Sequence, residues 1–274
     1  MLYGLFIVVI LLLFLWMVYL LLIMPAKVDK SKYKWFTSYK YAHRGLFTHD
    51  QTIPENSLPA FKRAVENGYG IELDVRISTD DQIYVFHDDT LTRMTGVDKK
   101  TETLSYPELL EYKLGNSDAK IPLFSEVLEI VNGKTPLIVE LKKSKRYPEL
   151  CQKTYDLLKN YKGNYCIESF DPRIVKWFKD NAPEILRGQL SMRYKKFKSF
   201  GDFIYKKIIL ENLLSNCSAK PHFIAYRWKD MDKLSLRLCK KLGAFMACWT
   251  VKDKEGWEKT EPFFDGIIFE SDKD

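Results

Sequence analysis

Residues 42–89 read AHRGLFTHDQTIPENSLPAFKRAVENGYGIELDVRISTDDQIYVFHDD, and the rest of the chain is interpreted outward from this stretch. It holds three of the four histidines, including His43 and His87, and an arginine directly after the first. It also holds two carboxylates spaced by one residue, Glu72 and Asp74. Histidines carry protons near neutral pH, carboxylates bind hard cations and arginine is a fixed positive charge. This combination indicates a site that hydrolyses a phosphodiester.

Short apolar runs alternate with helical stretches along the chain. The predicted strands are residues 39–43, 70–75, 83–86, 136–141, 165–170, 185–190, 223–226, 245–251 and 266–269. The predicted helices are residues 57–67, 124–131, 148–160, 172–181, 206–214 and 231–242. Repeated strand–helix alternation is typical of a parallel α/β fold.

Nine strands are one more than a (β/α)8 barrel contains. Residues 78–82 are too few for a parallel crossover, which needs about a dozen residues. The strand at 83–86 should therefore return antiparallel as a hairpin, leaving eight parallel strands. The sequence thus predicts a TIM-type (β/α)8 barrel with one added β-hairpin. A turn centred on residues 80–81 would place His87 opposite Asp74 on one face of that hairpin.

Three carboxylates are the candidate metal ligands. Glu72 and Asp74 lie two apart on one strand, so their side chains point the same way. Glu140 ends another strand, after Ile138 and Val139. Carboxylates crowded at the C-terminal ends of barrel strands repel one another unless a cation lies between them. They predict a site for Mg²⁺ or Ca²⁺, although each carboxylate alone is more commonly an ordinary charge at a strand end.

Two histidines are the candidate proton carriers. One of His43 and His87 would act as general base for the attacking hydroxyl or water, and the other would protonate the leaving alkoxide. The remaining two histidines are interpreted as bystanders. Arg44 suits bidentate contact with phosphate oxygens, and Lys142 suits a single charge on the same group. The alternative for Arg44 is a salt bridge to a nearby glutamate.

The order of these motifs resembles the glycerophosphodiester phosphodiesterase family, over roughly residues 39–270. The matching segments are His43-Arg44-Gly45, Pro54-Glu55-Asn56-Ser57, Ala60-Phe61, Glu72-Leu73-Asp74-Val75, His87-Asp88, Leu91-Thr92-Arg93, Ile121-Pro122-Leu123, Glu126-Val127-Leu128, Glu140-Leu141-Lys142, Ser169-Phe170 and Trp249-Thr250-Val251. The end of the chain departs from the family pattern, because Phe269-Glu270-Ser271-Asp272 replaces a Thr-Asp pair followed by proline. The resemblance therefore predicts nothing for that last loop.

The resemblance implies metal-dependent hydrolysis of a glycerophosphodiester to an alcohol and glycerol 3-phosphate, or of a lysophospholipid to lysophosphatidic acid. It implies a catalytic centre made of His43, Arg44, Glu72, Asp74, His87, Glu140 and Lys142. Glu55 and Asn56 match residues that line or brace this centre. Trp249 matches an aromatic residue that contacts substrate, or else it caps the barrel.

Two other functions remain open on the sequence. One is a phosphatidylinositol phospholipase C-like lyase, whose barrel also uses two histidines. The other is a catalytically inactive, membrane-tethered binding protein. The Glu-x-Asp pair and Glu140-Leu141-Lys142 favour the phosphodiesterase over the lyase, and the complete set of histidines and carboxylates argues against an inactive protein.

Residues 2–24 contain no charge and would form a helix of about 34 Å, which spans a bilayer core. We expect an uncleaved transmembrane anchor at 1–24, a linker at 25–38 and a barrel domain at 39–274. A cleaved signal peptide fits less well, because no basic residue precedes the apolar run and no clear cleavage site follows it. Lysines at 27, 30, 32, 34 and 40 predict that the catalytic domain is cytoplasmic on a single-pass cell-membrane protein.

Composition narrows the partners. The net charge of +7 favours anionic lipid or an anionic substrate, although it also serves solubility. Residues 191–216 interleave basic and aromatic side chains, which fits either a surface lying on anionic lipid or an ordinary solvated helix. No nucleic-acid module is recognisable. Five scattered cysteines predict free thiols in a reducing compartment. The oligomeric state is not predicted.

The linker allows two orientations of the barrel. Simple threading from the anchor would point the barrel mouth away from the membrane. An extended linker of about 15 residues could instead reach about 50 Å along the barrel and turn the mouth toward lipid. We expect the second arrangement, because residues 191–209 follow the C-terminal end of a strand and so lie on the mouth side.

Overall fold

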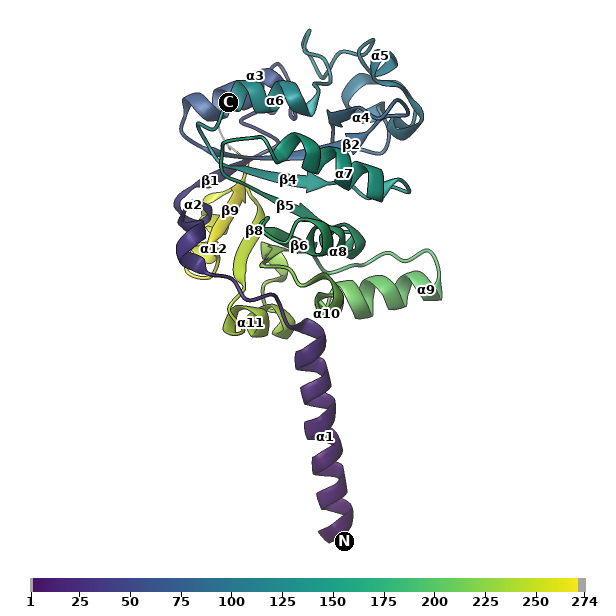
Figure 1. Ribbon diagram of the computed structural model, residues 1–274, viewed down its shortest axis with the longest axis vertical. Coiled ribbons are helices and arrows are strands. Elements are labelled where there is room, and N and C mark those ends of the chain that lie inside the picture. The colour runs from purple at the N-terminus through teal and green to yellow at the C-terminus, as the bar shows by residue number, and fades with distance from the viewer. Residues whose placement is uncertain (1, 271–274) are drawn as a thin grey trace.

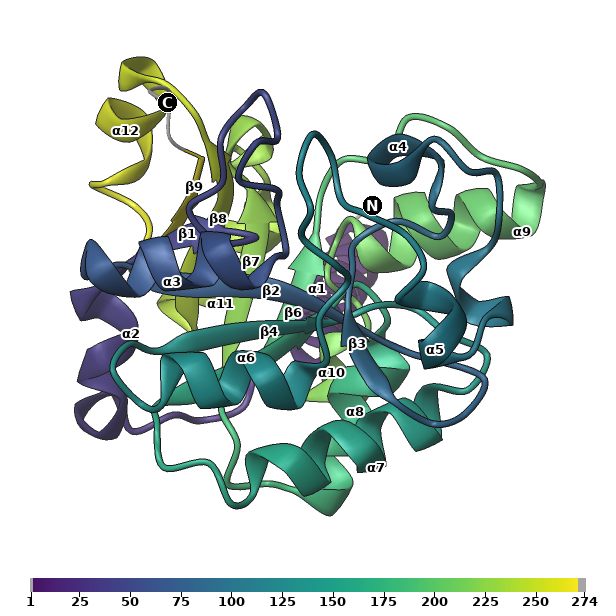
Figure 2. The ribbon, with the colours of Figure 1, turned by 90° about the horizontal axis from the view of Figure 1, so that it is seen from above.

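A closed barrel of eight parallel strands forms the body of the protein in this computed structural model, which describes residues 2–270. The strands are β1 (Lys40–His43), β2 (Gly70–Ile77), β4 (Leu137–Leu141), β5 (Tyr165–Ser169), β6 (Arg187–Ser191), β7 (Phe223–Arg227), β8 (Phe245–Val251) and β9 (Gly266–Phe269). The barrel closes because β1 pairs with both β2 and β9 (Figures 1 and 2). The predicted TIM-type fold is confirmed. Ser271 and Asp272 of the atypical last loop lie outside the described residues.

The added hairpin is also confirmed, but its predicted register is wrong by one residue. β3 (Ile83–Val85) runs antiparallel to β2, with Val75 opposite Val85. The backbone N–H of Phe86 donates to the Asp74 carbonyl over 3.0 Å, so Phe86, and not His87, faces Asp74. The turn starts at Ser78, whose N–H bonds the carbonyl of residue 82, and this choice of closing pair fixes the shift.

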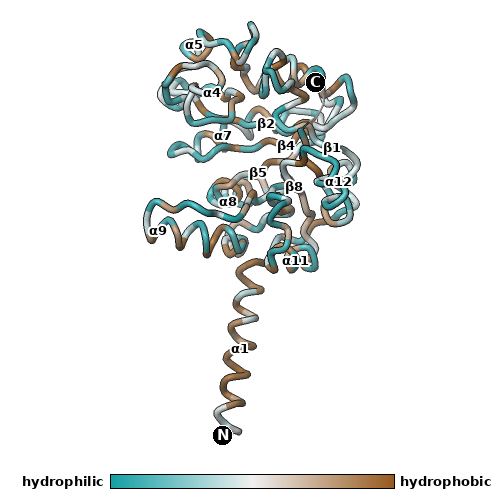
Figure 3. The backbone as a smooth tube through the Cα atoms, turned by 180° about the vertical axis from the view of Figure 1, so that it is seen from behind, coloured by the Kyte–Doolittle hydropathy of each residue, from teal (hydrophilic) through white to brown (hydrophobic). Residues whose placement is uncertain are grey.

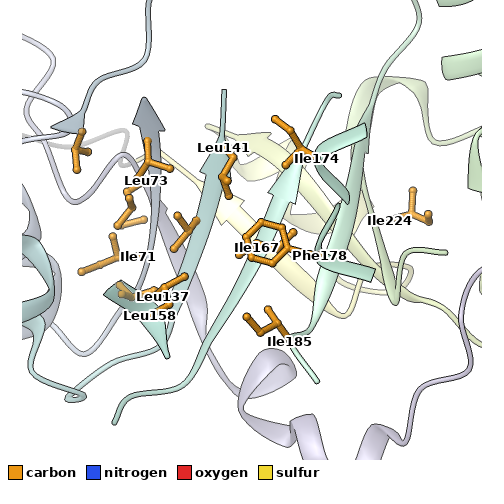
Figure 4. Packing of buried hydrophobic residues seen from close by; sticks show 14 of the residues in the cluster. Ile71, Leu73, Leu137, Leu141, Leu158, Ile167, Ile174, Phe178, Ile185 and Ile224 are labelled. Atoms are coloured by element: carbon orange, nitrogen blue, oxygen red, sulfur yellow. The ribbon is translucent and has the colours of Figure 1, made fainter. Parts of the chain in front are cut away.

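Helices cover the outside of the barrel. The main ones are α3 (Leu58–Glu66), α6 (Phe124–Val131), α7 (Tyr147–Leu158), α8 (Pro172–Asn181), α10 (Asn216–Ala219), α11 (Leu234–Lys241) and α12 (Lys254–Thr260). Alternate strand residues point outward and pack beneath them, as Ile167 does near Phe178 of α8 (Figure 4). Between β3 and α6, an insertion with α4 (Thr92–Thr95), η2 (Thr101–Thr103) and α5 (Tyr106–Leu109) buries an apolar cluster of its own.

The barrel interior is filled with apolar side chains at its N-terminal end. Tyr41, Ile138, Cys166, Phe223 and Phe245 are all buried in one cluster. The ring of Phe223 occupies the space where a side chain on residue 188 would lie, 2.1 Å from an ideal Cβ, so glycine is required at that position. This end of the barrel is therefore a packed core, and any ligand site belongs to the other end.

Residues 30–38 are folded, which contradicts the expected extended linker. They form η1 (Lys30–Tyr33) and α2 (Lys34–Ser38) beneath the N-terminal end of the barrel. Phe36 is fully buried, and its ring lies 4.9 Å from that of Phe223 and 5.3 Å from that of Phe245. Burial of this aromatic ring outweighs the freedom of an extended chain, so this segment does not run along the barrel.

α1 (Leu2–Ile23) projects from the barrel as a single apolar rod (Figures 1 and 3). Residues 3–23 are long and apolar enough to cross a membrane. The C-terminal end of α1 is fixed to the barrel, because Ile23 is buried and its carbonyl accepts from the Asn216 side chain over 2.9 Å. β2, β4 and β5 run across Figure 1 whereas α1 runs down it, and Figure 2 shows α1 end-on. The mouth therefore opens to the side of α1.

The predicted helix at 206–214 begins six residues earlier and has a different geometry. α9 (Phe200–Phe203) leads directly into η3 (Ile204–Leu210), which is a π-helix. The Ser199 side chain caps the start by accepting from the N–H of Asp202 over 3.1 Å. Periodicity alone does not distinguish a π-helix from an α-helix over so few residues.

Candidate active site

The candidate site is the polar continuation of the apolar barrel interior. Along a strand, every second residue points inward. His43 follows Tyr41 on β1 in this way, and Glu140 follows Ile138 on β4. The same strands that build the core at one end therefore present proton carriers and carboxylates at the mouth.

Glu72, Asp74 and Glu140 come together as predicted. One carboxylate oxygen from each lies within 4.8 Å of the others, and all three side chains are buried. Burial and the neighbouring Asp74 raise the pKa of Glu72 well above its ordinary value, and burial likewise raises the pKa of Glu140. Hard oxygen donors with unrelieved repulsion are the chemistry that suits Mg²⁺ or Ca²⁺, so the residues fit such an ion.

Lys142 partly balances this acidic cluster. Its Nζ lies 2.8 Å from Glu140 Oε1 and 3.2 Å from Asp74 Oδ1. Burial favours the neutral form of Asp74, but Lys142, His87 and Arg44 outweigh it and hold the pKa of Asp74 well below its ordinary value. Lys142 and Arg44, whose Nε lies 3.5 Å from Asp74 Oδ2, are two fixed positive charges beside three carboxylates, so a cation would still be attracted to the cluster.

The loop after β1 fixes the orientation of the acidic cluster. Arg44 and Asn56 both have positive φ, at 56° and 52°, and the Asn56 N–H donates to the Arg44 carbonyl over 2.8 Å. From this position the Arg44 N–H donates to Glu72 Oε2 over 3.0 Å. The Asn56 amide donates to Asp74 Oδ2 over 2.8 Å. Asn56 is therefore a bracing residue beneath the site and does not line the cavity.

Arg44 forms the salt bridge that was the alternative interpretation. Its Nη1 donates to Glu55 Oε1 over 2.7 Å. Glu55 also accepts two bonds from Arg93, at 2.6 and 2.8 Å. Arg44 still lines the cavity, so contact with a phosphate remains a prediction, and Glu55 positions both arginines.

Each candidate proton carrier is bonded to a carboxylate. His43 Nδ1 lies 2.8 Å from Glu270 Oε1, and His87 Nδ1 lies 2.6 Å from Asp88 Oδ1. His43 Nε2 lies 3.9 Å from Glu72 Oε2, at the edge of the acidic cluster. A carboxylate on Nδ1 orients an imidazole and leaves Nε2 to exchange a proton. The arrangement suits acid–base chemistry at both histidines.

One cavity of about 490 Å³ connects the acidic cluster with the two histidines. Its lining includes seven of the ten predicted residues, namely His43, Arg44, Glu55, Glu72, His87, Glu140 and Trp249. Asp74, Asn56 and Lys142 lie behind this lining through the bonds described above. The indole of Trp249 meets the ring of Phe170 edge-on at 5.5 Å between centroids. A larger cavity of about 790 Å³ beside the mouth contains none of the predicted residues.

The sequence analysis missed two carboxylates at the mouth. Glu168 on β5 is buried, lines the cavity and lies opposite Glu140 in the sheet. Its Oε2 has no hydrogen-bond partner among the described residues, and burial raises its pKa well above the ordinary value. Glu270 follows the end of β9. The inward alternation predicts both, since Glu168 is two residues after Cys166 and Glu270 two after Ile268.

The fold and the groups at its mouth are those of a TIM-barrel hydrolase. The chain belongs to the glycerophosphoryl diester phosphodiesterase family, whose model matches residues 43–270. It is 29% identical over 239 residues to a glycerophosphodiester phosphodiesterase of Caldanaerobacter subterraneus, covering 83% of this chain and 91% of that protein. The family match decides the alternatives of the sequence analysis in favour of a glycerophosphodiester phosphodiesterase.

Two further comparisons extend the picture. The chain is 34% identical over 184 residues to a lysophospholipase D of Rattus norvegicus, covering 60% of this chain and about half, 55%, of that protein. It is similar in fold to an Oleispira antarctica phosphodiesterase solved with its product sn-glycerol-3-phosphate, with a TM-score of 0.69, 21% identity and coverage of 84% and 92% of the two chains.

Proposed function

We propose that this phosphodiesterase uses His43 and His87 as its general base and general acid, with Mg²⁺ or Ca²⁺ held by Glu72, Asp74 and Glu140. The observation that carries the proposal is that both histidines, each bonded to a carboxylate, line the same cavity as Glu72 and Glu140 of the acidic cluster. A bound divalent cation would neutralise the carboxylates and polarise the phosphoryl oxygens.

The side chains perform the proton transfers of an in-line hydrolysis. One histidine takes a proton from water as the water oxygen bonds to phosphorus. The other gives a proton to the alcohol oxygen as its bond to phosphorus breaks, so the products are an alcohol and a phosphate monoester. Arg44 and Lys142 offer positive charge to the phosphate from the cavity wall and from behind the carboxylates. Trp249 and Phe170 offer an apolar wall to the rest of the substrate.

The proposed substrates are glycerophosphodiesters, including lysophospholipids. Family membership supports the glycerophosphodiester headgroup, and the likeness to a lysophospholipase D supports a substrate with one acyl chain. The products would be glycerol 3-phosphate or lysophosphatidic acid.

We place the enzyme on the cell membrane, with α1 as a single-pass anchor and the barrel in the cytoplasm. The support is the exposed apolar length of α1 and the lysines that follow it. The proposed boundaries are 1–24 for the anchor, 25–38 for the connection and 39–274 for the barrel domain, with residues 30–38 packed on the barrel.

One experiment tests the reaction. Purified full-length protein with Mg²⁺ or Ca²⁺ is given a panel of glycerophosphodiesters and lysophospholipids, and products are identified by mass spectrometry. We expect an alcohol and a phosphate monoester, and no activity after chelation. Accumulation of a cyclic phosphate would identify a lyase instead, and undiminished activity in thoroughly chelated protein would refute the metal site.

A further inference from the structure

An exposed apolar stripe runs along α9 and η3. Phe200, Ile204 and Ile208 are four residues apart, and Phe200 is 79% exposed. Phe197, just before α9, is also exposed, and its ring packs against that of Phe203 at 5.1 Å. A run of large apolar side chains on one helical face is unusual on a soluble surface and marks an interaction site.

Basic residues border this stripe. Lys195, Lys196 and Lys198 precede α9 and are exposed. Their side chains have no ion-pair partner within residues 2–270. Lys206, by contrast, is paired with Asp202 at 3.0 Å. Exposed apolar residues beside unpaired lysines are typical of helices that lie in the interface of an anionic membrane.

The position of the apolar stripe relative to α1 indicates that the stripe contacts the membrane. α10 follows η3 after a short turn, and α10 holds the end of α1 through the bond from Asn216 to the Ile23 carbonyl. Figure 1 shows α9 and η3 extending crosswise from the point where α1 leaves the barrel. When α1 crosses a bilayer, this helix therefore lies at the level of the bilayer surface.

We propose that α9 and η3 form a second membrane contact, in which Phe200, Ile204 and Ile208 insert into the anionic leaflet that α1 crosses. The inference rests on the proposed anchor. Two contacts fix the barrel on its side, with the mouth opening along the membrane surface and not into it. A substrate in the same leaflet then approaches the mouth laterally.

Depth measurements on the full-length chain test this contact. Nitroxide labels are placed singly through Phe200→Cys, Leu12→Cys or Leu110→Cys, each combined with Cys217→Ser, because the other four cysteines are buried. Leu110 is a matched control, since it is an exposed leucine next to α5, on the side of the molecule far from α1 (Figure 1). The protein is reconstituted in vesicles of phosphatidylcholine and phosphatidylglycerol.

We expect the labels at positions 12 and 200 to be accessible to oxygen and shielded from an aqueous nickel complex, and the label at position 110 to be in water. If the label at 12 is in the bilayer and that at 200 is in water, the second contact is refuted and the anchor stands. If the label at 12 is itself in water, the anchor and the inference both fail. The hydrolysis of soluble glycerophosphocholine, measured on the same samples, reports the proposed function separately.

A groove on the other face of the same helix carries a second inference. It has a volume of about 260 Å³, and its lining includes Met192, Tyr205 and Leu210. Phe170 lines both this groove and the catalytic cavity, so the two adjoin at its ring. We infer that the groove takes the acyl chain of a lysophospholipid whose phosphate lies in the catalytic cavity, and this rests on the proposed function.

A narrowed groove tests this subsite. Met192→Trp should lower kcat/KM for a long-chain lysophospholipid about tenfold, equivalent to about 1.4 kcal/mol, and leave glycerophosphocholine hydrolysis unchanged. Met192→Leu conserves volume and should behave as the unmodified enzyme. An equal loss on both substrates, or no loss on either, would refute the subsite. Absence of activity on both substrates in the unmodified enzyme would refute the proposed function itself.

Discussion

Each of the two histidines at the mouth is held by one carboxylate, and the two pairs are not equivalent. Glu270 follows the last barrel strand, whereas Asp88 is the immediate neighbour of His87. Burial and Arg44 lower the pKa of His43, while Glu270 opposes that change. A neutral, oriented imidazole at His43 suits a proton acceptor.

Substrates with different leaving groups separate the two roles. His43→Ala and His87→Ala should each lower kcat on glycerophosphocholine by roughly 10²–10⁴, the usual share of general acid–base catalysis. A p-nitrophenyl leaving group needs no proton, so the variant that lacks the general acid should regain activity on a p-nitrophenyl diester. We expect one variant to recover and the other not. Near-normal turnover of glycerophosphocholine by either variant would remove that histidine from the mechanism.

His222 predicts a dependence of stability on pH. Burial and the neighbouring Arg187 lower the pKa of His222 to about 4. Because the folded pKa is below the unfolded value of about 6.5, the unfolded chain binds the proton more tightly, and the free energy of unfolding falls as pH drops from about 6.5 to about 4, by about 3 kcal/mol. Urea unfolding across this range measures the loss. His222→Asn keeps an acceptor for the Arg187 N–H and should flatten the dependence; an unchanged slope would contradict it.

The site residues that belong to a recognisable sequence motif were predicted. Those that only the inward alternation of strand residues identifies were missed. Glu72, Asp74 and Glu140 stand out because they interrupt apolar runs. Glu168 also interrupts an apolar run, after Ile167. However, the residue beside it in the site, Glu140, belongs to another strand and is distant in the sequence. For Arg44 the sequence left two interpretations open, a phosphate contact and a salt bridge, and only the structure shows the salt bridge to Glu55.

At the level of elements, the acidic cluster lies where the neighbouring parallel strands β2 and β4 pair, which places Asp74 opposite Glu140. This alignment crowds like charges and should make the metal-free protein less stable than the metal-bound one. We expect Mg²⁺ or Ca²⁺ to raise the Tm, with a stabilisation of about 2.7 kcal/mol at a concentration 100 times Kd. Glu72→Gln should abolish activity and most of that rise, while surface Glu66→Gln keeps both. A cation-induced rise that survives in Glu72→Gln would exclude Glu72 as a ligand.

The short helix α2 stabilises the barrel through its buried residue Phe36. Phe36 closes the N-terminal end of the barrel against Tyr41, Phe223 and Phe245. Phe36→Ala should therefore lower the free energy of unfolding by about 3–5 kcal/mol. Exposed Phe200→Ala, as a control, should change it little. Equal stability of the Phe36→Ala variant and the unmodified protein, measured by urea unfolding, would show that α2 is dispensable.

Element order and the hairpin could be predicted because apolar runs and connection lengths determine them. The hairpin register could not, since it depends on which pair closes the turn, and Ser78 closes it one residue from the expected position. The folded state of residues 30–38 was hidden for a similar reason. Their polar and aromatic composition is that of a linker until the open end of the barrel provides a site for Phe36.

At the scale of the whole molecule, the apolar helix α1 projects from the side of the barrel. Ile23 is buried and bonded at its carbonyl by Asn216, so the rod and the barrel meet at a fixed joint and not at a flexible tether. The expected arrangement with the mouth toward lipid relied on a free linker, which the structure does not contain. We propose lateral access along the membrane surface in its place.

This arrangement leads to a prediction for the anchor. Deleting residues 2–17 removes the exposed part of α1 and keeps Ile23 in its buried position. The truncated enzyme should hydrolyse soluble glycerophosphocholine at the full rate, because the catalytic cavity is at the mouth and involves no part of α1. Its turnover of a lysophospholipid held in vesicles should fall, because the enzyme no longer shares the surface with its substrate.

A full-length control separates the effect of the α1 anchor from that of the apolar stripe on α9 and η3. Phe200→Ser with Ile204→Ser and Ile208→Ser keeps the anchor but removes the apolar stripe, and burial of even one such side chain is worth more than about 1.4 kcal/mol, or tenfold. This variant should lose at least about tenfold of its activity on vesicle-bound lysophospholipid and none on the soluble diester, whereas Leu110→Ser should lose activity on neither. If truncated and full-length enzymes act equally on vesicles, the anchor serves only to locate the protein and the soluble diester is the better candidate substrate.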